Sequence, residues 1–335
     1  MPDASTAPHP EPGAWREDVL GPDFEARTLP LPDGAEAVLV RHVPSTPGDD
    51  GGSPGAVART AVLSVHGFVD YFFHPHVARA VAARGHAFYA VDLRGHGRAL
   101  AAHVAGGRDP NLVDDLTLYA QDLDAAAAVV RAAGHERLVV LGHSTGGLVA
   151  PLWANARPGR ADALVLNSPW LELNESWLMR GPATWAIDVV GRVAPRLVVG
   201  SVGEHYGAAL HHETGGEWDY DLAWKPHAGF PARAGWLRSV RRAHHRVARG
   251  LDLTIPVLVL ASDRSGPARS WHDELVTTDS VLDVAHIRDR APRLGSDVTV
   301  RTVAGGAHDL ALSPRPARDA YLAAVLDWIE ALPHS

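Results

Sequence analysis

The stretch 142–146, Gly-His-Ser-Thr-Gly, fits the pattern G-x-S-x-G and contains a serine that could act as a nucleophile, Ser144. A short apolar run at 138–141 precedes it and predicts a buried strand, and 147–150 indicates the first turn of a helix. A serine on so sharp a turn adopts a strained backbone, and the two glycines leave room because they have no Cβ. We therefore predict that Ser144 is a nucleophile. The alternative is a glycine-rich turn that only packs.

A serine hydroxyl is a poor nucleophile unless a base removes its proton. The sequence has 20 histidines, and His308 lies on a glycine-rich loop just after the predicted strand 298–303. It is also the last histidine before the predicted final helix at 316–331, as the chain order nucleophile, acid, base requires. We predict that His308 is this base. The alternative is a structural loop histidine.

An acid is needed to hold the imidazole in one tautomer and to stabilise its cation. Three aspartates that follow the predicted strand 256–261 compete for this role. Asp263 comes directly after the strand, whereas Asp279 and Asp283 lie beyond an additional segment at 265–277. We favour Asp279, and the residues alone leave the other two open.

These residues need a particular arrangement of strands and helices to meet. The segments 24–31 and 35–43 predict an antiparallel hairpin at a sheet edge. Strands are then predicted at 60–65, 87–91, 138–141, 163–167, 256–261 and 298–303, and helices at 77–84, within 111–133 and at 316–331. This alternation predicts the α/β class, with a mostly parallel, doubly wound sheet. Ligands bind beyond the carboxyl ends of such strands, where Ser144 lies.

The alternation of strands and helices stops after Pro169 and resumes at Ile255. We predict that residues 170–250 form a helical cap, or lid, inserted after the sixth strand, and that residues 13–169 and 251–335 form the core. Tryptophans are concentrated in this cap and either line a site for an apolar substrate or form the cap's own small core. They are Trp170, Trp177, Trp185, Trp218, Trp224 and Trp236.

Arginines recur at helical spacing near the end of the predicted cap. This spacing favours one solvated helix face, and the alternative is an anchor for an anionic head group or a membrane surface. The arginines are Arg238, Arg241, Arg242, Arg246 and Arg249.

Composition excludes several classes of function. The formal charge of -8 argues against a general nucleic-acid binder, and the absence of cysteine excludes disulfides, thiolate zinc sites and cysteine nucleophiles.

Closely spaced histidines at 74 and 76, 211–212 and 244–245 are interpreted as surface residues, so we expect no metal. Residues 1–12 predict a disordered tail without the features of a signal peptide. Because no apolar run could span a bilayer, we expect a cytoplasmic protein.

Further motifs run through most of the chain: His66-Gly67, Asp92-x-Arg94-Gly95-His96-Gly97, the serine motif extended to Gly147, Asn167-Ser168-Pro169 and Gly306-Ala307-His308. Together they resemble the α/β-hydrolases of the monoacylglycerol lipase and lysophospholipase type. The resemblance implies the α/β-hydrolase fold and an oxyanion hole made by the backbone N–H groups of Phe68 and Thr145. Asp279-Ser280-Val281-Leu282 is similar to the family's acid-bearing stretch, although Asp263-Arg264 is similar to its D-R pair.

We therefore expect a serine hydrolase that cleaves carboxylic esters of lipophilic substrates through an acyl-enzyme, with Ser144, Asp279 and His308 as its triad. The expected substrates are monoacylglycerol, lysophospholipid or short-acyl esters, and no cofactor is needed. Alternatives on the same triad are a thioesterase, an amidase or a carbon–carbon bond hydrolase, and a further one is a ligand-binding protein with a vestigial triad. We expect a monomer or homodimer without stable membrane insertion, whose only membrane contact would be peripheral, through the cap.

Overall fold

The computed structural model describes residues 13–43, 57–174, 187–201, 203–268 and 270–333. The predicted disordered tail at 1–12 lies outside the described residues, as do Trp177 and Trp185 of the predicted cap. Within the described residues, no helix is both long enough and apolar enough to cross a membrane.

The centre of the molecule is a nine-stranded sheet in the order β1-β2-β3-β5-β4-β6-β7-β10-β11. The predicted hairpin is confirmed, because β2 pairs with β3 in antiparallel fashion. The last six strands in this order, β5-β4-β6-β7-β10-β11, are parallel to one another. The strands are β1 (Arg16–Asp18), β2 (Gly21–Pro30), β3 (Glu36–His42), β4 (Thr60–Val65), β5 (Ala87–Asp92), β6 (Arg137–His143), β7 (Ala163–Asn167), β10 (Val257–Ser262) and β11 (Val298–Val303).

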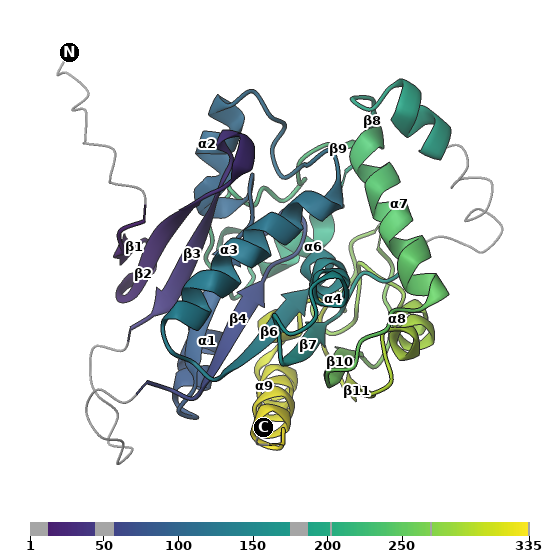
Figure 1. Ribbon diagram of the computed structural model, residues 1–335. Coiled ribbons are helices and arrows are strands. Elements are labelled where there is room, and N and C mark those ends of the chain that lie inside the picture. The colour runs from purple at the N-terminus through teal and green to yellow at the C-terminus, as the bar shows by residue number, and fades with distance from the viewer. Residues whose placement is uncertain (1–12, 44–56, 175–186, 202, 269, 334–335) are drawn as a thin grey trace.

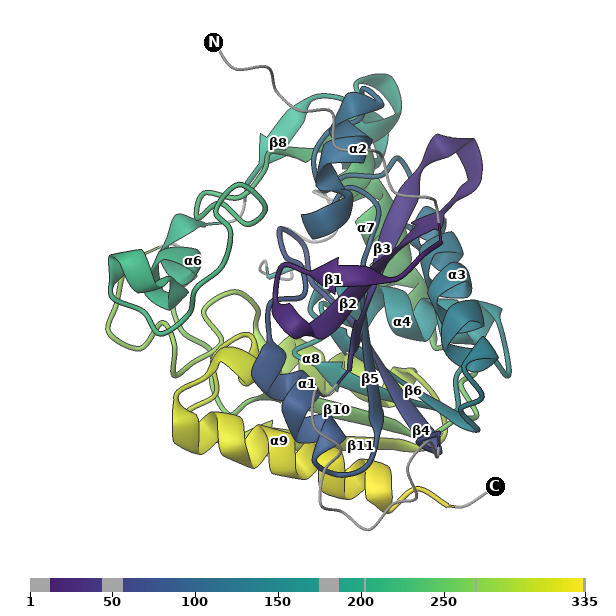
Figure 2. The ribbon, with the colours of Figure 1, turned by 90° about the vertical axis from the view of Figure 1, so that its left-hand side faces the viewer.

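Helices cover both faces of this sheet. Helices α3 and α4 lie in front of it in Figure 1, and α1 and α9 lie on the other face, as the view turned by 90° in Figure 2 shows. The core helices are α1 (Pro75–Ala82), α2 (Leu100–Ala105), α3 (Tyr119–Ala132), α4 (Thr145–Ala156), α8 (Val284–Arg290) and α9 (Arg315–Glu330). The sequence analysis did not predict β1, α2 or α8, which are short elements without a long periodic pattern.

Alternate residues of the central strands supply two separate cores. On β4, Ala61 and Leu63 pack into the core beneath α3 and α4, whereas Val62 packs into the core beneath α1 and α9. Because successive side chains of a strand point to opposite faces, a strand covered on both faces must be apolar throughout. This explains why β4, β6, β7 and β10 are recognisable as short apolar runs.

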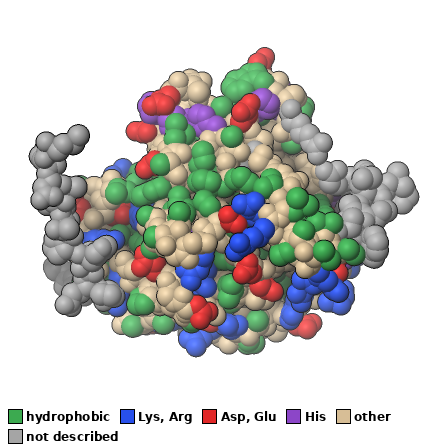
Figure 3. All heavy atoms as spheres, turned by 90° about the horizontal axis from the view of Figure 1, so that it is seen from above, with side chains coloured by type: hydrophobic (Ala, Val, Ile, Leu, Met, Phe, Trp, Pro, Cys, Tyr) green, Lys and Arg blue, Asp and Glu red, His purple; other side chains and the backbone are tan. Residues whose placement is uncertain are grey.

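Residues 170–250, which we call the insertion, connect β7 to β10. The described parts contain a helical stretch at 187–193 and, in chain order, β8 (Val198–Gly200), α6 (Glu204–Leu210), β9 (Ala232–Arg233) and α7 (Ala234–Arg249). The insertion follows the seventh strand of the sheet rather than the sixth, because β1 adds one strand at the start. It also contains the small β8-β9 sheet, so it is not wholly helical. Figure 3 looks down on the side where the insertion lies and shows hydrophobic side chains across its centre.

The predicted solvated face of α7 is wrong for one of its arginines. Arg241 is buried and forms an ion pair with Glu172, which lies in the segment after β7. The described arginines Arg242, Arg246 and Arg249 are exposed. The helical spacing predicted one solvated face for all five arginines. The Arg241 side chain is buried instead, where it pairs with the buried carboxylate of Glu172.

Candidate active site

Ser144 lies between the end of β6 and the start of α4, so the predicted strand, turn and helix are confirmed. Its backbone has φ 51° and ψ -112°, a strained conformation for a residue with a Cβ. The glycine two positions later allows this turn, because a Cβ on Gly146 would collide with the carbonyl oxygens of Val65 and His66. The turn therefore depends on a close approach between α4 and the end of β4.

The three side chains predicted to form a triad lie within hydrogen-bonding distance of one another. His308 Nε2 is 3.1 Å from Ser144 Oγ, and His308 Nδ1 is 3.0 Å from Asp279 Oδ1. Asp279 is fully buried, and it also accepts hydrogen bonds from the N–H groups of Val281 and Leu282 at 3.0 and 2.7 Å. These bonds hold the carboxylate in one orientation toward the imidazole.

The other two candidate aspartates lie elsewhere. The exposed Asp263 accepts a hydrogen bond from the N–H of Gly305 at 3.0 Å, and Asp283 caps the N-terminus of α8 by accepting from Ala285 N–H. The segment of Asp279 reaches the imidazole because it folds back on residues 264–266, where Asp279 N–H donates to the carbonyl of Arg264 at 3.0 Å. With the loop at 265–277 in between, the carboxylate that faces the imidazole is that of Asp279 and not that of Asp263 at the strand end.

The two backbone N–H groups predicted to form an oxyanion hole come from Phe68 and Thr145. Within the described part of the chain, neither N–H has a hydrogen-bond acceptor, and both residues line the same cavity as Ser144. A Cβ on Gly67 would lie 3.1 Å from the Cβ of Ser144, so the loop that carries Phe68 approaches the serine closely. The predicted donors are therefore near the serine, and their role stays a prediction.

The cavity beneath the insertion has a volume of about 790 Å³. One part is apolar, with Phe68 stacked on Trp236 at 4.3 Å and Trp170 beside Trp236. Another part is polar and contains Tyr206 and Lys225. Burial raises the pKa of Tyr206 well above its ordinary value, so its phenol stays neutral. A lining with both apolar and polar groups suits a molecule with an apolar chain and a polar end.

A buried ion pair lines the same cavity as the serine. Lys225 Nζ is 2.6 Å from Asp70 Oδ1, and both side chains are largely buried. Burial is the largest effect on the pKa of Asp70 and would raise it, but the Lys225 ammonium and the rings of His74, His143 and His66 together lower this pKa to about 2. Burial lowers the pKa of His143 to about 4, so this ring is neutral near pH 7.

Sequence reasoning did not identify Asp70 and Lys225. One signal was present, because Lys225 is the only lysine in a chain with 31 basic residues. The pairing itself joins residues 155 positions apart, and no local pattern reports such a contact.

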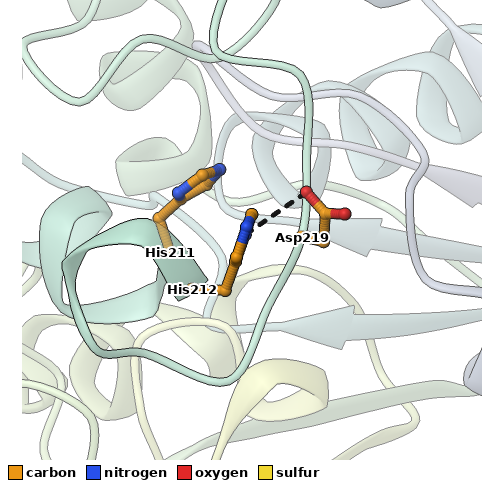
Figure 4. Close-up of side chains that lie close together, drawn as sticks. All are labelled: His211, His212 and Asp219. Carbon is orange, nitrogen blue, oxygen red and sulfur yellow. Dashed lines mark ion pairs between the residues drawn. The ribbon is translucent and has the colours of Figure 1, made fainter.

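Among the residues that the structure describes, two groups of side chains have the composition of a metal site. In the first, shown in Figure 4, His212 pairs with Asp219 at 3.4 Å. Both ring nitrogens of its third member, His211, are already engaged, because Nε2 donates to the carbonyl of Tyr220 and Nδ1 accepts from Glu213 N–H. Neither nitrogen can bind a metal without losing a hydrogen bond.

The second group consists of Asp70, His143 and Asp309, all buried. Asp70 is paired with Lys225, and the carboxylate of Asp309 is bound by His74 at 3.2 Å and by Asn167 at 2.8 Å. These bonds compete with any metal for the carboxylate oxygens.

The interpretation of the histidine pairs as surface residues is wrong for one member of each pair. His74, His211 and His244 are buried. Each forms a hydrogen bond across the fold, to Asp309, to Tyr220 and to Trp170 respectively. A polar ring can be buried where such a partner is available, which the spacing in the sequence does not reveal.

Comparisons with known proteins identify similar hydrolases. The family model described as serine aminopeptidase, S33 (Hydrolase_4) matches residues 56–315. A curated monoacylglycerol lipase from Mycolicibacterium smegmatis is 32% identical over 152 residues, which are 44% of this chain and 50% of that protein. The match therefore spans only half the length of this relative.

Solved structures share the fold at low sequence identity. A soluble variant of monoglyceride lipase from Saccharomyces cerevisiae, in complex with a substrate analog, aligns with a TM-score of 0.64 and 14% identity, over 96% of this chain and 99% of that chain. A thermostable carboxyl esterase from Bacillus coagulans, in complex with glycerol, aligns with a TM-score of 0.63 and 15% identity, over 92% and 98%. Because the identities are low, these likenesses establish the fold alone, and the predicted α/β-hydrolase fold is confirmed.

Replacing Gly146 by alanine should destabilise the protein, because the new Cβ would collide with the carbonyl oxygens of Val65 and His66. We expect the free energy of unfolding to fall by about 1–3 kcal/mol, the usual cost of overpacking. Urea denaturation measures it. Gly200→Ala is the matched control, because a Cβ there meets nothing within 4 Å. Equal denaturation midpoints for the two variants would contradict the packing described for the turn.

Proposed function

The chain belongs to the serine aminopeptidase S33 (Hydrolase_4) family of α/β-hydrolases, and on that premise we propose that it is a serine hydrolase that cleaves carboxylic esters. The observation that carries this proposal is the continuous contact from Asp279 through His308 to Ser144, at 3.0 and 3.1 Å, on the wall of a large cavity. This arrangement fits a nucleophile, a base and an orienting acid.

In the proposed mechanism, Ser144 Oγ attacks the ester carbonyl while His308 Nε2 accepts the hydroxyl proton. The Asp279 carboxylate, held by two backbone N–H groups, keeps Nδ1 protonated and stabilises the imidazolium that forms. The N–H groups of Phe68 and Thr145 donate to the oxyanion, and such a donor contributes about 3–4 kcal/mol to transition-state stabilisation. His308 then protonates the leaving alcohol, and water releases the acid from the acyl-enzyme.

We propose lipophilic esters as the substrates and the insertion as a cap over the site. Phe68, Trp170 and Trp236 provide an apolar wall for an acyl chain, and the curated relative is named a monoacylglycerol lipase. The polar group beside His308, the phenol of Tyr206, suits the alcohol portion of the ester. The family description names an aminopeptidase, so amides are the second class to test.

Replacing Ser144 by alanine should abolish ester turnover. With p-nitrophenyl esters, we expect the wild type to release nitrophenol with an initial burst, and Ser144→Ala to lose at least ~10³-fold in kcat, because only residual transition-state binding remains. A fluorophosphonate probe should label the wild type alone. Ser296→Ala, at an exposed serine, is the matched control.

Two outcomes of the same assay would contradict the ester proposal. Labelling that depends on Ser144 without ester turnover would favour a ligand-binding protein. Turnover of aminoacyl p-nitroanilides in place of esters would favour an aminopeptidase.

The triad acid can be identified by comparing three isosteric variants. Asp279→Asn should lower kcat by roughly 10³–10⁴-fold, because an amide favours the wrong imidazole tautomer. Asp263→Asn and Asp283→Asn should stay within about threefold of the wild type, because asparagine can still accept the N–H bonds that these aspartates accept. Near-normal kcat in Asp279→Asn would refute its assignment.

Lengthening the acyl chain should raise kcat/KM until the apolar part of the cavity is full. Each buried methylene contributes about 0.8 kcal/mol, so the octanoate ester should exceed the acetate ester by at least tenfold. Trp236→Ala should reduce this ratio, whereas Trp271→Ala, at a tryptophan 56% exposed, should leave it unchanged. A flat series from acetate to octanoate would contradict lipophilic specificity.

A further inference from the structure

One part of the insertion docks directly on the loop that follows β4, residues 66–73, which we call the oxyanion loop. The N–H of Asp221 donates to the Tyr71 hydroxyl at 2.8 Å, and the rings of Trp224 and Tyr71 meet edge to face at 5.1 Å. The next residue, Lys225, forms the buried ion pair with Asp70. Three contacts, all made by residues 221–225 of the insertion, thus join it to the loop that carries Phe68.

Both charged groups of this ion pair are largely shielded from water, so each is stabilised by the other and not by solvent. The Asp70 side chain is 4% exposed and the Lys225 side chain 15% exposed. The ammonium also lies over the rings of Phe73 and Tyr220, at 5.4 and 5.7 Å from their centres. An unpaired carboxylate in this place would be costly, and removing one partner of such a pair costs far more than the pair contributes.

Asp70 belongs to the loop that carries the proposed oxyanion donor. Its Oδ2 lies 3.4 Å from Gly67 N, at the outer limit of a hydrogen bond, and Gly67 is the residue before Phe68. Between Phe68 and Asp70, Val69 has φ 50°, which is strained for a β-branched residue. Strained backbone persists only where its surroundings hold it, and the ion pair joins this loop to the insertion. An unpaired carboxylate on the lining of the cavity that contains Ser144 would also oppose a negative charge that forms there.

We propose that Lys225 is a positioning residue, which neutralises Asp70 and holds the oxyanion loop in the shape that presents the Phe68 N–H to the oxyanion. The inference rests on the proposed ester hydrolysis. It makes the insertion part of the catalytic apparatus rather than only a cover for the substrate.

The test compares kcat among variants of the ion pair with a medium-chain p-nitrophenyl ester. Lys225→Met should lower kcat about 10- to 100-fold, the range expected when a catalytic donor is misplaced but not deleted, and should leave KM within about threefold. Asp70→Asn/Lys225→Met should have a kcat between Lys225→Met and the wild type, because the bare carboxylate is gone but the loop is no longer held. Lys225→Arg should retain most of the activity.

An oxyanion readout separates positioning from simple loosening of the cavity. A trifluoromethyl ketone with the same acyl chain forms a tetrahedral oxyanion on the serine, so its Ki should rise in Lys225→Met by the same factor as kcat/KM falls. Arg233→Met is the matched control. It breaks another ion pair between the insertion and the core, with Asp109 at 2.9 Å, and within the described residues neither partner forms a hydrogen bond or ion pair with the oxyanion loop. Its kcat should equal that of the wild type.

Several results would overturn the inference while leaving the ester proposal intact. They are a wild-type kcat in Lys225→Met, a rise in KM without a fall in kcat, or a double variant that is no better than Lys225→Met. If Lys225→Met does not fold, the double variant decides, and wild-type kcat in it would overturn the inference. Absence of Ser144-dependent ester turnover in the wild type would instead refute the proposed function, and the inference with it.

Discussion

The rest of the site depends on the strained turn at Ser144. A φ of 51° at a serine requires that the end of β4, the end of β6 and the first turn of α4 pack without side chains between them, and Gly142 and Gly146 make this possible. Once these elements are in contact, the loop after β4 must pass beside the serine. The same close packing thus directs Ser144 Oγ into the cavity and brings the Phe68 N–H near to it.

The parallel sheet converts this local geometry into a site made of distant residues. Ser144 follows β6, the Phe68 loop follows β4, and His308 follows β11, so all three lie beyond the carboxyl ends of parallel strands. Asn167, at the end of β7, donates to the carboxylate of Asp309 and accepts from Leu310 N–H, which anchors the two residues that follow His308. The imidazole is therefore held from the sheet as well as from Asp279.

The insertion contacts the core beside the candidate site. Trp236 stacks on Phe68, and Lys225 pairs with Asp70, so two separate parts of the insertion contact the loop that follows β4. A buried ion pair adds little net stability, but removing one of its partners is costly. These contacts are the observations on which the proposed role of Lys225 rests.

The sequence by itself determined the elements whose signals are local. The strand, turn and helix at Ser144 follow from apolar periodicity and glycine spacing, and the loop position of His308 follows from the strand before it. The tertiary structure decided which aspartate faces the imidazole, because the path of residues 264–282 determines that distance and periodicity does not. It also decided that Arg241 and His244 are buried and that Lys225 meets Asp70. Those contacts join residues far apart in the chain, and their burial is favourable only when both partners are already in place.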